Sequence, residues 1–223
     1  MSRHGYSRDM HEVDWAEVFA QQQKRRPAIE AWLDALELAP GARMADFGCG
    51  PGLAVLLAAR RVGPQGWVCG IDRSAGALAF LQQQYRQLAG QDPAGLGRVF
   101  TVQADAASAQ LPGSVDAALV TNMLHHADDP QGVLANVSRW LVPGGTVVVA
   151  EFDPAAAGEF GPPLEERLAP DVLQRWAEAA GLQRVRSLPG GSEQYAFLLR
   201  KPHGRGNADS RPAGTGRSPG ASP

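Results

Sequence analysis

The most constraining feature of this chain is the stretch Met-Ala-Asp-Phe-Gly-Cys-Gly-Pro-Gly at positions 44–52. A short apolar strand ends in Asp46, and glycines follow at the alternate positions Gly48, Gly50 and Gly52. A helical pattern of leucines begins immediately afterwards. Glycine at this density lets the backbone turn sharply and leaves bare main chain for a ligand to lie against. The N–H groups at the helix start favour a polar or anionic ligand group, so the stretch predicts a loop for a nucleotide-type cofactor.

The spacing of these glycines does not favour a nicotinamide dinucleotide. That fingerprint, Gly-x-Gly-x-x-Gly, would place its third glycine at position 53 when counted from Gly48, and this position is Leu53. A nicotinamide-dependent oxidoreductase therefore remains an alternative from another enzyme class. A tight strand-to-helix turn without a ligand is the purely structural interpretation of the same glycines.

Two acids at the ends of predicted strands strengthen the cofactor interpretation. Residues 66–71 form an apolar strand that ends in Asp72, and residues 99–103 form another that ends in Ala104-Asp105. Asp72 is well placed to accept both hydroxyls of a ribose, and Asp105 suits the exocyclic amine of adenine. Each such charge-assisted hydrogen bond contributes about 1.5–3 kcal/mol. A lone strand-end acid is usually solvated, but two of them after a glycine loop indicate a nucleoside.

With these motifs in this order, the chain resembles the small bacterial type of class I S-adenosylmethionine-dependent methyltransferases. Residues 44–52 resemble the first motif of that family, and residues 115–126 resemble its fourth strand and the following catalytic-face loop. The turn at 141–145 resembles the one that enters the fifth strand, and the likeness covers about residues 25–200. The resemblance implies S-adenosylmethionine as the cofactor. The residues it implies for binding are Asp46, Gly48, Cys49, Gly50, Gly52, Asp72, Arg73, Asp105, Ala106 and Asn122.

The order of the elements predicts an α/β fold with a Rossmann-like, seven-stranded, mostly parallel sheet covered by helices on both faces. Residues 182–188 and 194–200 have no helix between them, so we expect them to form a C-terminal antiparallel hairpin. The methyltransferase domain is expected to span residues 13–201. Residues 1–12 are expected to be flexible, and 202–223, which lack large apolar side chains, to be a disordered Gly/Pro/Ser/Arg tail.

Composition excludes several classes of function. The net charge of −2 provides no basic surface for nucleic acid, and no apolar run is long enough to span a bilayer. Two cysteines are too few for a convincing zinc site, so no metal is expected. Free thiols and the absence of a secretory signal favour a cytoplasmic protein, as a monomer or homodimer. The basic run Lys24-Arg25-Arg26 is interpreted as solvated helix surface.

The chemistry implied by the resemblance is direct in-line displacement of an activated methyl group onto a small-molecule acceptor, for which the protein mainly supplies proximity and orientation. A general base is needed only if the acceptor must lose a proton, and His125 and His126 are the candidates. The alternative for these histidines is a structural role in the loop. A non-catalytic module that binds the cofactor is the alternative for the whole chain.

Three further expectations concern the acceptor. Asn122-Met123-Leu124-His125 departs from the Asn-Pro-Pro-aromatic motif of amino-methyltransferases that act on nucleobases, which argues against DNA adenine methylation. Glu151 and Asp153 leave the fifth strand on the same edge, where they could orient an acceptor or a cation, or pair with an arginine. The long connection 153–169 is expected to cover the acceptor together with the N-terminal helices.

Overall fold

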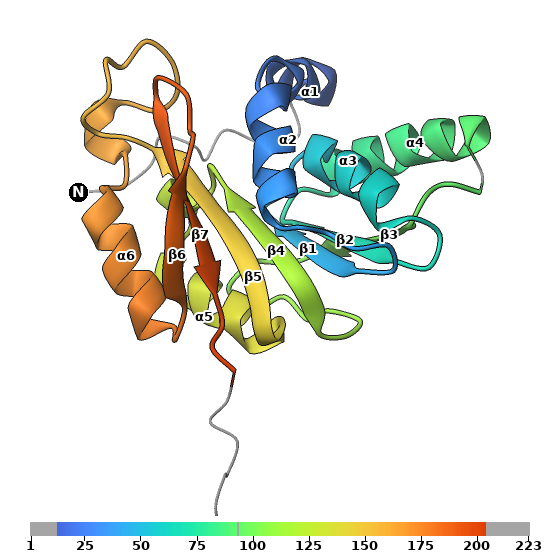
Figure 1. The fold of residues 1–223 in the computed structure, drawn as a ribbon. Coiled ribbons are helices and arrows are strands. Elements are labelled where there is room, and N and C mark those ends of the chain that lie inside the picture. Colours follow the sequence, from blue (N-terminus) through green and yellow to red (C-terminus); the bar gives the residue numbers. More distant parts are fainter. Residues whose placement is uncertain (1–12, 93, 204–223) are drawn as a thin grey trace, which may run out of the picture.

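A computed structural model describes residues 13–92 and 94–203 of the chain. The predictions for residues 1–12 and for residues 204–223 of the tail therefore lie outside the described residues. Figure 1 shows one twisted sheet with helices on both faces. The helices are α1 (Trp15–Lys24), α2 (Arg26–Ala35), α3 (Leu53–Val62), α4 (Ala75–Gln91), α5 (Pro130–Trp140), α6 (Pro170–Ala179) and the short 3-10 turns η1 (Leu124–His126) and η2 (Leu164–Glu166).

The sheet has seven strands in the order β3-β2-β1-β4-β5-β7-β6. β1 pairs with β2 and β4 in parallel, β2 pairs likewise with β3, and β4 with β5. β7 pairs antiparallel with both β5 and β6, which confirms the predicted C-terminal hairpin. The strands are β1 (Arg43–Phe47), β2 (Trp67–Asp72), β3 (Arg98–Gln103), β4 (Val115–Thr121), β5 (Leu141–Phe152), β6 (Gln183–Leu188) and β7 (Gln194–Arg200).

Alternation along the central strands builds two cores, one on each face of the sheet. Met44 of β1 packs with α2, α3 and α4, whereas Ala45 and Phe47 pack with α5 and α6. Because side chains alternate, Asp46 lies on the same face as Met44, beneath the N-terminal helices. The face on which the key acid sits is thus fixed by the burial pattern of β1.

The fifth strand is longer than the sequence suggests. The predicted turn 141–145 is part of β5, which begins at Leu141 opposite Val115. The pairing then shifts, and the next partners are Ala117 and Thr146. Gly144 in this interval has a φ of 83°, a value that glycine adopts readily, so the extra residues form an irregularity within the strand.

Local capping signals set the starts of several helices. The side chain of Ser74 accepts a hydrogen bond from Ala77 N at 3.2 Å at the start of α4, and Asp129 accepts one from Gly132 N at 2.8 Å at the start of α5. Trp32 of α2 is 1% exposed and donates from Nε1 to the carbonyl of Pro189 at 3.0 Å. Trp32 therefore packs inside the domain and ties α2 to the β6–β7 turn.

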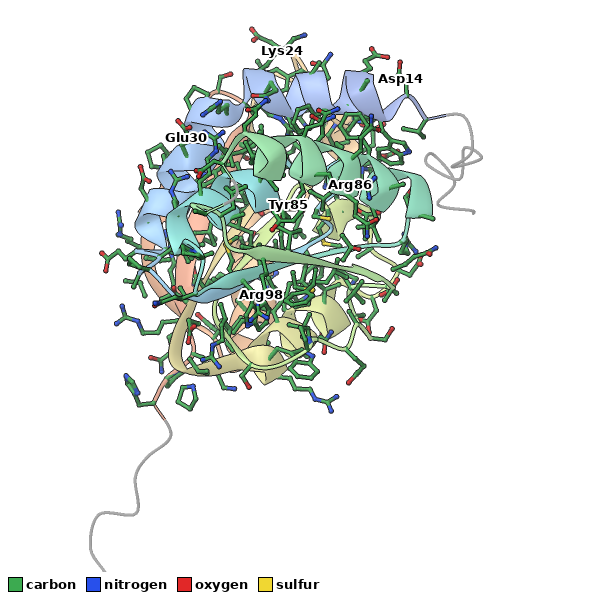
Figure 2. All side chains as sticks on the ribbon, turned by 90° about the vertical axis from the view of Figure 1, so that its right-hand side faces the viewer. Asp14, Lys24, Glu30, Tyr85, Arg86 and Arg98 are labelled. Atoms are coloured by element: carbon green, nitrogen blue, oxygen red, sulfur yellow. The ribbon has the colours of Figure 1, made fainter. Side chains whose placement is uncertain are left out.

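Helix α1 is held differently from the others, because none of its side chains is fully buried. Figure 2, in which Asp14 and Lys24 mark its two ends, shows that it lies along the outside of the molecule over α4. The rings of Phe19 and Phe80 meet there with centroids 5.4 Å apart. No helix in the described residues combines the length and apolar character needed to cross a membrane.

Leu33 provides a test of the core on the α2 face. Its side chain is 0% exposed, so Leu33→Ala should lower the free energy of unfolding by about 2–5 kcal/mol. Leu164→Ala is the matched control, because Leu164 is 42% exposed and its truncation should change stability by less than about 0.5 kcal/mol. Urea unfolding followed by circular dichroism measures both. Equal effects in the two variants would contradict the assigned core.

Candidate functional site

The glycine loop forms a cradle that only glycine can line without strain. Gly48, Gly50 and Gly52 have φ values of 78°, 54° and 87°. A Cβ at Gly52 would lie 2.4 Å from Leu81 Cδ1, and one at Gly48 would lie 2.8 Å from a side-chain atom of Met123. Backbone conformation therefore requires glycine at all three positions, and steric space requires it as well at Gly48 and Gly52.

The loop is fixed to the neighbouring strand by its own main chain. The amide groups of Gly48 and Cys49 both donate to the carbonyl of Ile71, at 2.8 and 2.9 Å. The amide of Gly50 donates to Asp72 Oδ2 at 2.8 Å. These bonds bring the end of β1, the loop and the end of β2 together, which is the arrangement that the sequence predicts.

Asp46 is the unusual group of the site. Its side chain lies at the buried end of β1, 2% exposed, and its Oδ1 is the buried side-chain atom for which the described residues offer no hydrogen-bond partner. Burial, and then the nearby Asp72 carboxylate, raises the pKa of Asp46 to about 7. An unsatisfied buried oxygen is costly, so this position calls for a donor that the described residues do not supply.

A cavity of about 170 Å³ lies against Asp46, where the order of the sheet reverses between β1 and β4. Ligands of open α/β sheets bind at such points, outside the carboxyl ends of the strands. Sites for whole drug-sized ligands measure roughly 300–1,000 Å³, so this space fits only part of a nucleotide-type cofactor. Its lining comprises Val18, Gln22, Arg25, Ile29, Trp32, Asp46, Gly48, Cys49, Gly50, Pro51, Ala54, Thr121 and Asn122.

Several residues of this lining lie outside the site predicted from the sequence, and the two that carry long polar side chains are Gln22 and Arg25. Gln22 accepts a hydrogen bond from Leu53 N at 3.1 Å and donates from Nε2 to the carbonyl of Cys49 at 3.3 Å, so α1 clasps the glycine loop. Arg25 belongs to the run interpreted as solvated surface, and its neighbours Lys24 and Arg26 are indeed exposed. Arg25 instead lines the cavity, and burial lowers the pKa of its guanidinium from the ordinary value.

The two predicted nucleoside acids both lie at strand ends and both hold main-chain amides. Besides Gly50 N, the Asp72 carboxylate accepts from Ser74 N at 2.9 Å through Oδ1. Asp105 accepts from Ala107 N at 2.8 Å. Arg73 lies between them and the next loop, with its guanidinium 3.6 Å from Asp105 Oδ2 and 2.7 Å from Asp128 Oδ2.

The loop after β4 is organised by Glu151, a residue of β5 that is 0% exposed. Its Oε1 accepts from the amides of Met123 and Leu124 at 2.9 and 2.7 Å. Its Oε2 lies 2.6 Å from His125 Nδ1. Because a carboxylate only accepts, His125 Nδ1 is the donor of this hydrogen bond, which fixes the orientation of the ring and leaves Nε2 as its other nitrogen. Glu151 thus pairs with a histidine and with the loop rather than with an arginine.

The two candidate bases differ in environment. The His125 side chain is 2% exposed, and its ring lies 3.8 Å from that of His126 and 5.8 Å from that of Phe152, measured between centroids. Burial, then the neighbouring His125 and Arg73, lowers the pKa of His126 to about 4. His126 is therefore neutral at physiological pH and a weak proton acceptor.

The remaining predicted cofactor residues have mixed surroundings. Asn122 lines the cavity in a left-handed conformation, φ 54°, and its side-chain oxygen accepts from Gln194. Ala106 is buried, and its carbonyl accepts from the side chain of Asn136 at 2.9 Å. Cys49 is buried as well, and burial raises the pKa of its thiol well above the ordinary value, so it is no nucleophile.

The segment 153–169, seen at the top left of Figure 1, is anchored by one buried ion pair. Arg167 Nη1 lies 2.7 Å from Glu193 Oε2, and both side chains are at most 1% exposed. Arg167 also donates to the carbonyls of Asp153, Phe160 and Pro162 at 2.7–3.0 Å. The side chain of Asp153 accepts a hydrogen bond from Ala155 N at 2.8 Å, and within the described residues it forms no ion pair with an arginine.

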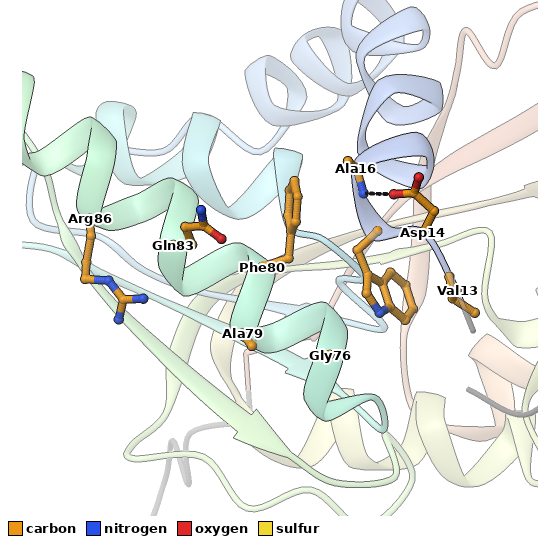
Figure 3. Close-up of a pocket in the computed structure, with 9 residues that line it drawn as sticks. Val13, Asp14, Ala16, Gly76, Ala79, Phe80, Gln83 and Arg86 are labelled. Atoms are coloured by element: carbon orange, nitrogen blue, oxygen red, sulfur yellow. Dashed lines mark hydrogen bonds between the residues drawn. The ribbon is translucent and has the colours of Figure 1, made fainter. Parts of the chain in front are cut away.

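A second, larger hollow of about 520 Å³ lies between the start of α1 and the outer face of α4 (Figure 3). Trp15 and Phe80 supply its aromatic walls, and Gly76 and Ala79 part of its lining. The glycine loop and the strand-end acids do not line this hollow. The acid in its lining is Asp14, which caps the start of α1. The hollow is therefore separate from the cavity at Asp46. Across the described residues, no group of three or more His, Cys, Asp or Glu could hold a metal ion.

Comparisons with known proteins agree with this arrangement. Residues 45–149 match the family model of the methyltransferase domain. The nocamycin O-methyltransferase of Saccharothrix syringae is 31% identical over 74% of this chain and 58% of its own length. The aklanonic acid methyltransferase DauC of a Streptomyces species is 28% identical over 80% of each chain. The chain spans about half the length of many of the curated relatives that it matches.

Among solved structures, a SAM-dependent methyltransferase from Aquifex aeolicus superimposes with a TM-score of 0.69, covering 78% of this chain and 89% of that one at 21% identity. At this identity the likeness supports the fold. The glycine loop, the strand-end acids and the antiparallel last strand occur in the predicted order along the same sheet. The chain therefore belongs to the class I methyltransferases, the family whose cofactor is S-adenosylmethionine.

Proposed function

We propose that the chain is an enzyme that transfers a methyl group from S-adenosylmethionine to a hydroxyl oxygen of a small molecule. The unsatisfied Oδ1 of Asp46 beside the glycine cradle is the observation that carries the cofactor assignment, because this buried acceptor has no donor in the described residues and a ligand can supply one. An ammonium group, such as that of the cofactor's methionine end, is such a donor. The choice of a hydroxyl acceptor rests on relatives such as the nocamycin O-methyltransferase and on the pairing of His125 with Glu151.

The cofactor is assigned to the carboxyl edge of β1, β2 and β3. Asp46 holds the methionine ammonium, and the backbone of Gly48 to Gly52 lies along the methionine end. Asp72 takes the ribose hydroxyls. Its oxygens already accept from Gly50 and Ser74, but each carboxylate oxygen has a further acceptor site. Asp105 takes the adenine amine in competition with the distant contact from Arg73.

The sulfonium of S-adenosylmethionine supplies an activated methyl group with a good leaving group when bound. The chain's own contribution is to place the acceptor in line and, for a hydroxyl, to accept its proton. Glu151 fixes the His125 ring so that Nε2 is the accepting atom. Since this ring is 2% exposed, the acceptor reaches it only after the 122–126 loop or the 153–169 segment moves.

Two other functions make different demands on the chain. A nicotinamide oxidoreductase would need a pyrophosphate cradle, and Leu53 stands where its third glycine is required. A non-catalytic module would bind the cofactor through the same residues. It would not require the buried imidazole of His125, which Glu151 orients beside the site. The His125–Glu151 pair therefore favours the enzyme over the module.

Calorimetric titration of the purified protein tests the cofactor assignment. S-adenosylhomocysteine should bind with a micromolar dissociation constant, and NADH under the same conditions should not bind. Release of S-adenosylhomocysteine from S-adenosylmethionine, measured over a panel of phenols and hydroquinones, then tests the enzyme. Binding of NADH alone would overturn the proposal, and tight S-adenosylhomocysteine binding without turnover on any acceptor would favour the module.

The raised pKa of Asp46 predicts how binding depends on pH. In the empty site this carboxyl is protonated below about pH 7, so binding of an ammonium must first expel a proton. The affinity for S-adenosylhomocysteine should therefore rise between about pH 5 and 7 and level off above. Asp46→Asn should bind at least tenfold more weakly at pH 8 and lose this dependence. A variant that keeps the same pH profile would show that Asp46 is not the responsible group.

His125 and His126 can be separated by matched substitutions. His125→Gln keeps a side-chain donor for Glu151, so the fold should survive, but the rate of hydroxyl methylation should fall by about 100-fold or more. His126→Gln should lower the rate by less than about tenfold, because the depressed pKa of His126 makes it a poor base. Single-turnover rates with saturating S-adenosylmethionine measure both. An unchanged rate in His125→Gln would mean that transfer proceeds without this base.

A further inference from the structure

The two outer strands of the sheet, β3 and β6, differ in how open their free edges are. β6 carries the exposed side chains of Arg184 and Arg186, and its pairing with β7 is irregular at Val185 between them. Charges and bulges of this kind keep an edge strand from pairing with another chain. β3 pairs with β2 without an irregularity, and its central residues 99–102 carry no charge. The edge of β3 therefore lacks the protection that β6 has.

The free edge of β3, which faces the viewer in Figure 2, presents main-chain groups at alternate residues. The amides of Arg98 and Ala104 both donate to carbonyls at the side of β2, at 3.1 Å. In a strand, residues of one parity bond to one neighbour and those between them direct their amides and carbonyls to the other side. On that other side the described chain supplies no further strand. The outward residues are Val99, Thr101 and Gln103.

One face of β3 leaves an aromatic side chain exposed beside this edge. α4 packs on the other face, where Gln82 Nε2 donates to Thr101 Oγ1 at 2.6 Å. The connection from β3 to β4 contains no helix. Phe100 is 38% exposed and meets the partly buried Trp67 edge to face, with ring centroids 5.9 Å apart. An exposed aromatic beside a free strand edge provides apolar surface for a pairing strand to cover.

We infer that two copies of the chain pair through β3, antiparallel and about a two-fold axis at Thr101, so that their two sheets become one. This inference is independent of the proposed function. A two-fold interface uses the same patch on both copies, so the patch must match itself. With Thr101 opposite Thr101 of the second copy, Val99 lies opposite Gln103. Each of these pairs joins two outward residues, which can exchange both main-chain hydrogen bonds.

The same register also matches the side chains. Phe100 of each copy lies opposite Val102 of the other, on the face away from α4. Arg98, at the start of β3, forms no ion pair within the described residues, and its guanidinium lies over the Phe100 ring, 5.8 Å from the centroid. An antiparallel partner brings Arg98 toward Asp105, which follows the end of the other copy's β3, so opposite charges meet at both ends of the interface. Apolar and charged groups match in one register, which favours a second copy over an unrelated strand.

Sedimentation equilibrium of the full-length protein tests whether this interface forms. The wild type should have about twice the chain mass of 23.6 kDa at micromolar concentration. Phe100→Lys should weaken dimerisation about tenfold or more, because it removes the apolar contact and adds a positive charge beside Arg98. Val185→Lys is the matched control, because Val185 is 44% exposed and lies in the other outer strand. It should leave the dimer unchanged.

Cysteine substitutions test the register. In Thr101→Cys the two introduced thiols face each other across the two-fold axis, with a Cα separation of about 5.5 Å that suits a disulfide. Oxidation in air with copper phenanthroline should therefore yield a covalent dimer. Gln103→Cys is the control, because Gln103 lies opposite Val99 and its two thiols lie on different sides of the axis, so little covalent dimer should form. The native cysteines are both buried.

Three outcomes overturn the inference. A wild type that stays monomeric at high micromolar concentration would show that the edge of β3 does not pair. A dimer that Phe100→Lys leaves intact, or that Val185→Lys dissociates, would place the interface elsewhere. Cross-linking in Gln103→Cys but not in Thr101→Cys would reject the two-fold axis at Thr101. Melting temperatures report on folding, and if Phe100→Lys fails to fold, the cross-linking of Thr101→Cys decides the question. S-adenosylhomocysteine binding, which tests the proposed function, is measured separately.

Discussion

Main-chain amides that neutralise strand-end carboxylates hold the functional edge of this sheet together. Glu151 accepts from two consecutive amides of the β4 loop, Asp72 accepts from the glycine loop and from the start of α4, and Asp105 accepts within its own turn. Buried carboxylates require such donors, and loops that supply them acquire a defined shape. Asp46 is the exception, because the glycine loop turns its amides toward Ile71 instead. The loop geometry that satisfies its neighbours thus leaves Asp46 for a ligand.

The segment 153–169 at the same edge is also organised by a buried charge that bonds to main-chain groups, but here the charge is positive and the main-chain groups are carbonyls. Arg167 is a buried cation whose donors go to three loop carbonyls and to Glu193, and Glu193 in turn accepts from the amides of Gly158 and Glu159. A 17-residue connection without regular strands or long helices would otherwise be costly to order. The buried pair replaces the hydrogen bonds that secondary structure would have made. In this segment the exposed Phe160 lies against Phe152, which in turn contacts His125.

Local signals in the sequence were sufficient to predict the fold and to place the glycine loop and the strand-end acids along one edge of the sheet. Glycines at alternate positions, an acid after each apolar strand and capping residues such as Ser74 act within a few residues, so a single sequence displays them. The pairs His125–Glu151 and Arg167–Glu193 are each separated by 26 residues, and their partners are chosen by how the sheet edge folds. Arg25 was misjudged for a related reason: the basic run describes composition, whereas the turn between α1 and α2 decides which of its members faces inward.

Helix α1 links these observations, because it is the helix that packs least tightly against the rest of the fold. It buries no side chain completely. Its contacts include the Phe19–Phe80 ring pair with α4 and the hydrogen bonds of Gln22 to the glycine loop. A ligand in the cavity at Asp46 would contact both the sheet and this helix, because Val18 and Gln22 of α1 line that cavity. Binding and helix ordering are thermodynamically linked. The free energy by which the ordered helix strengthens cofactor binding therefore equals the free energy by which the bound cofactor stabilises the ordered helix.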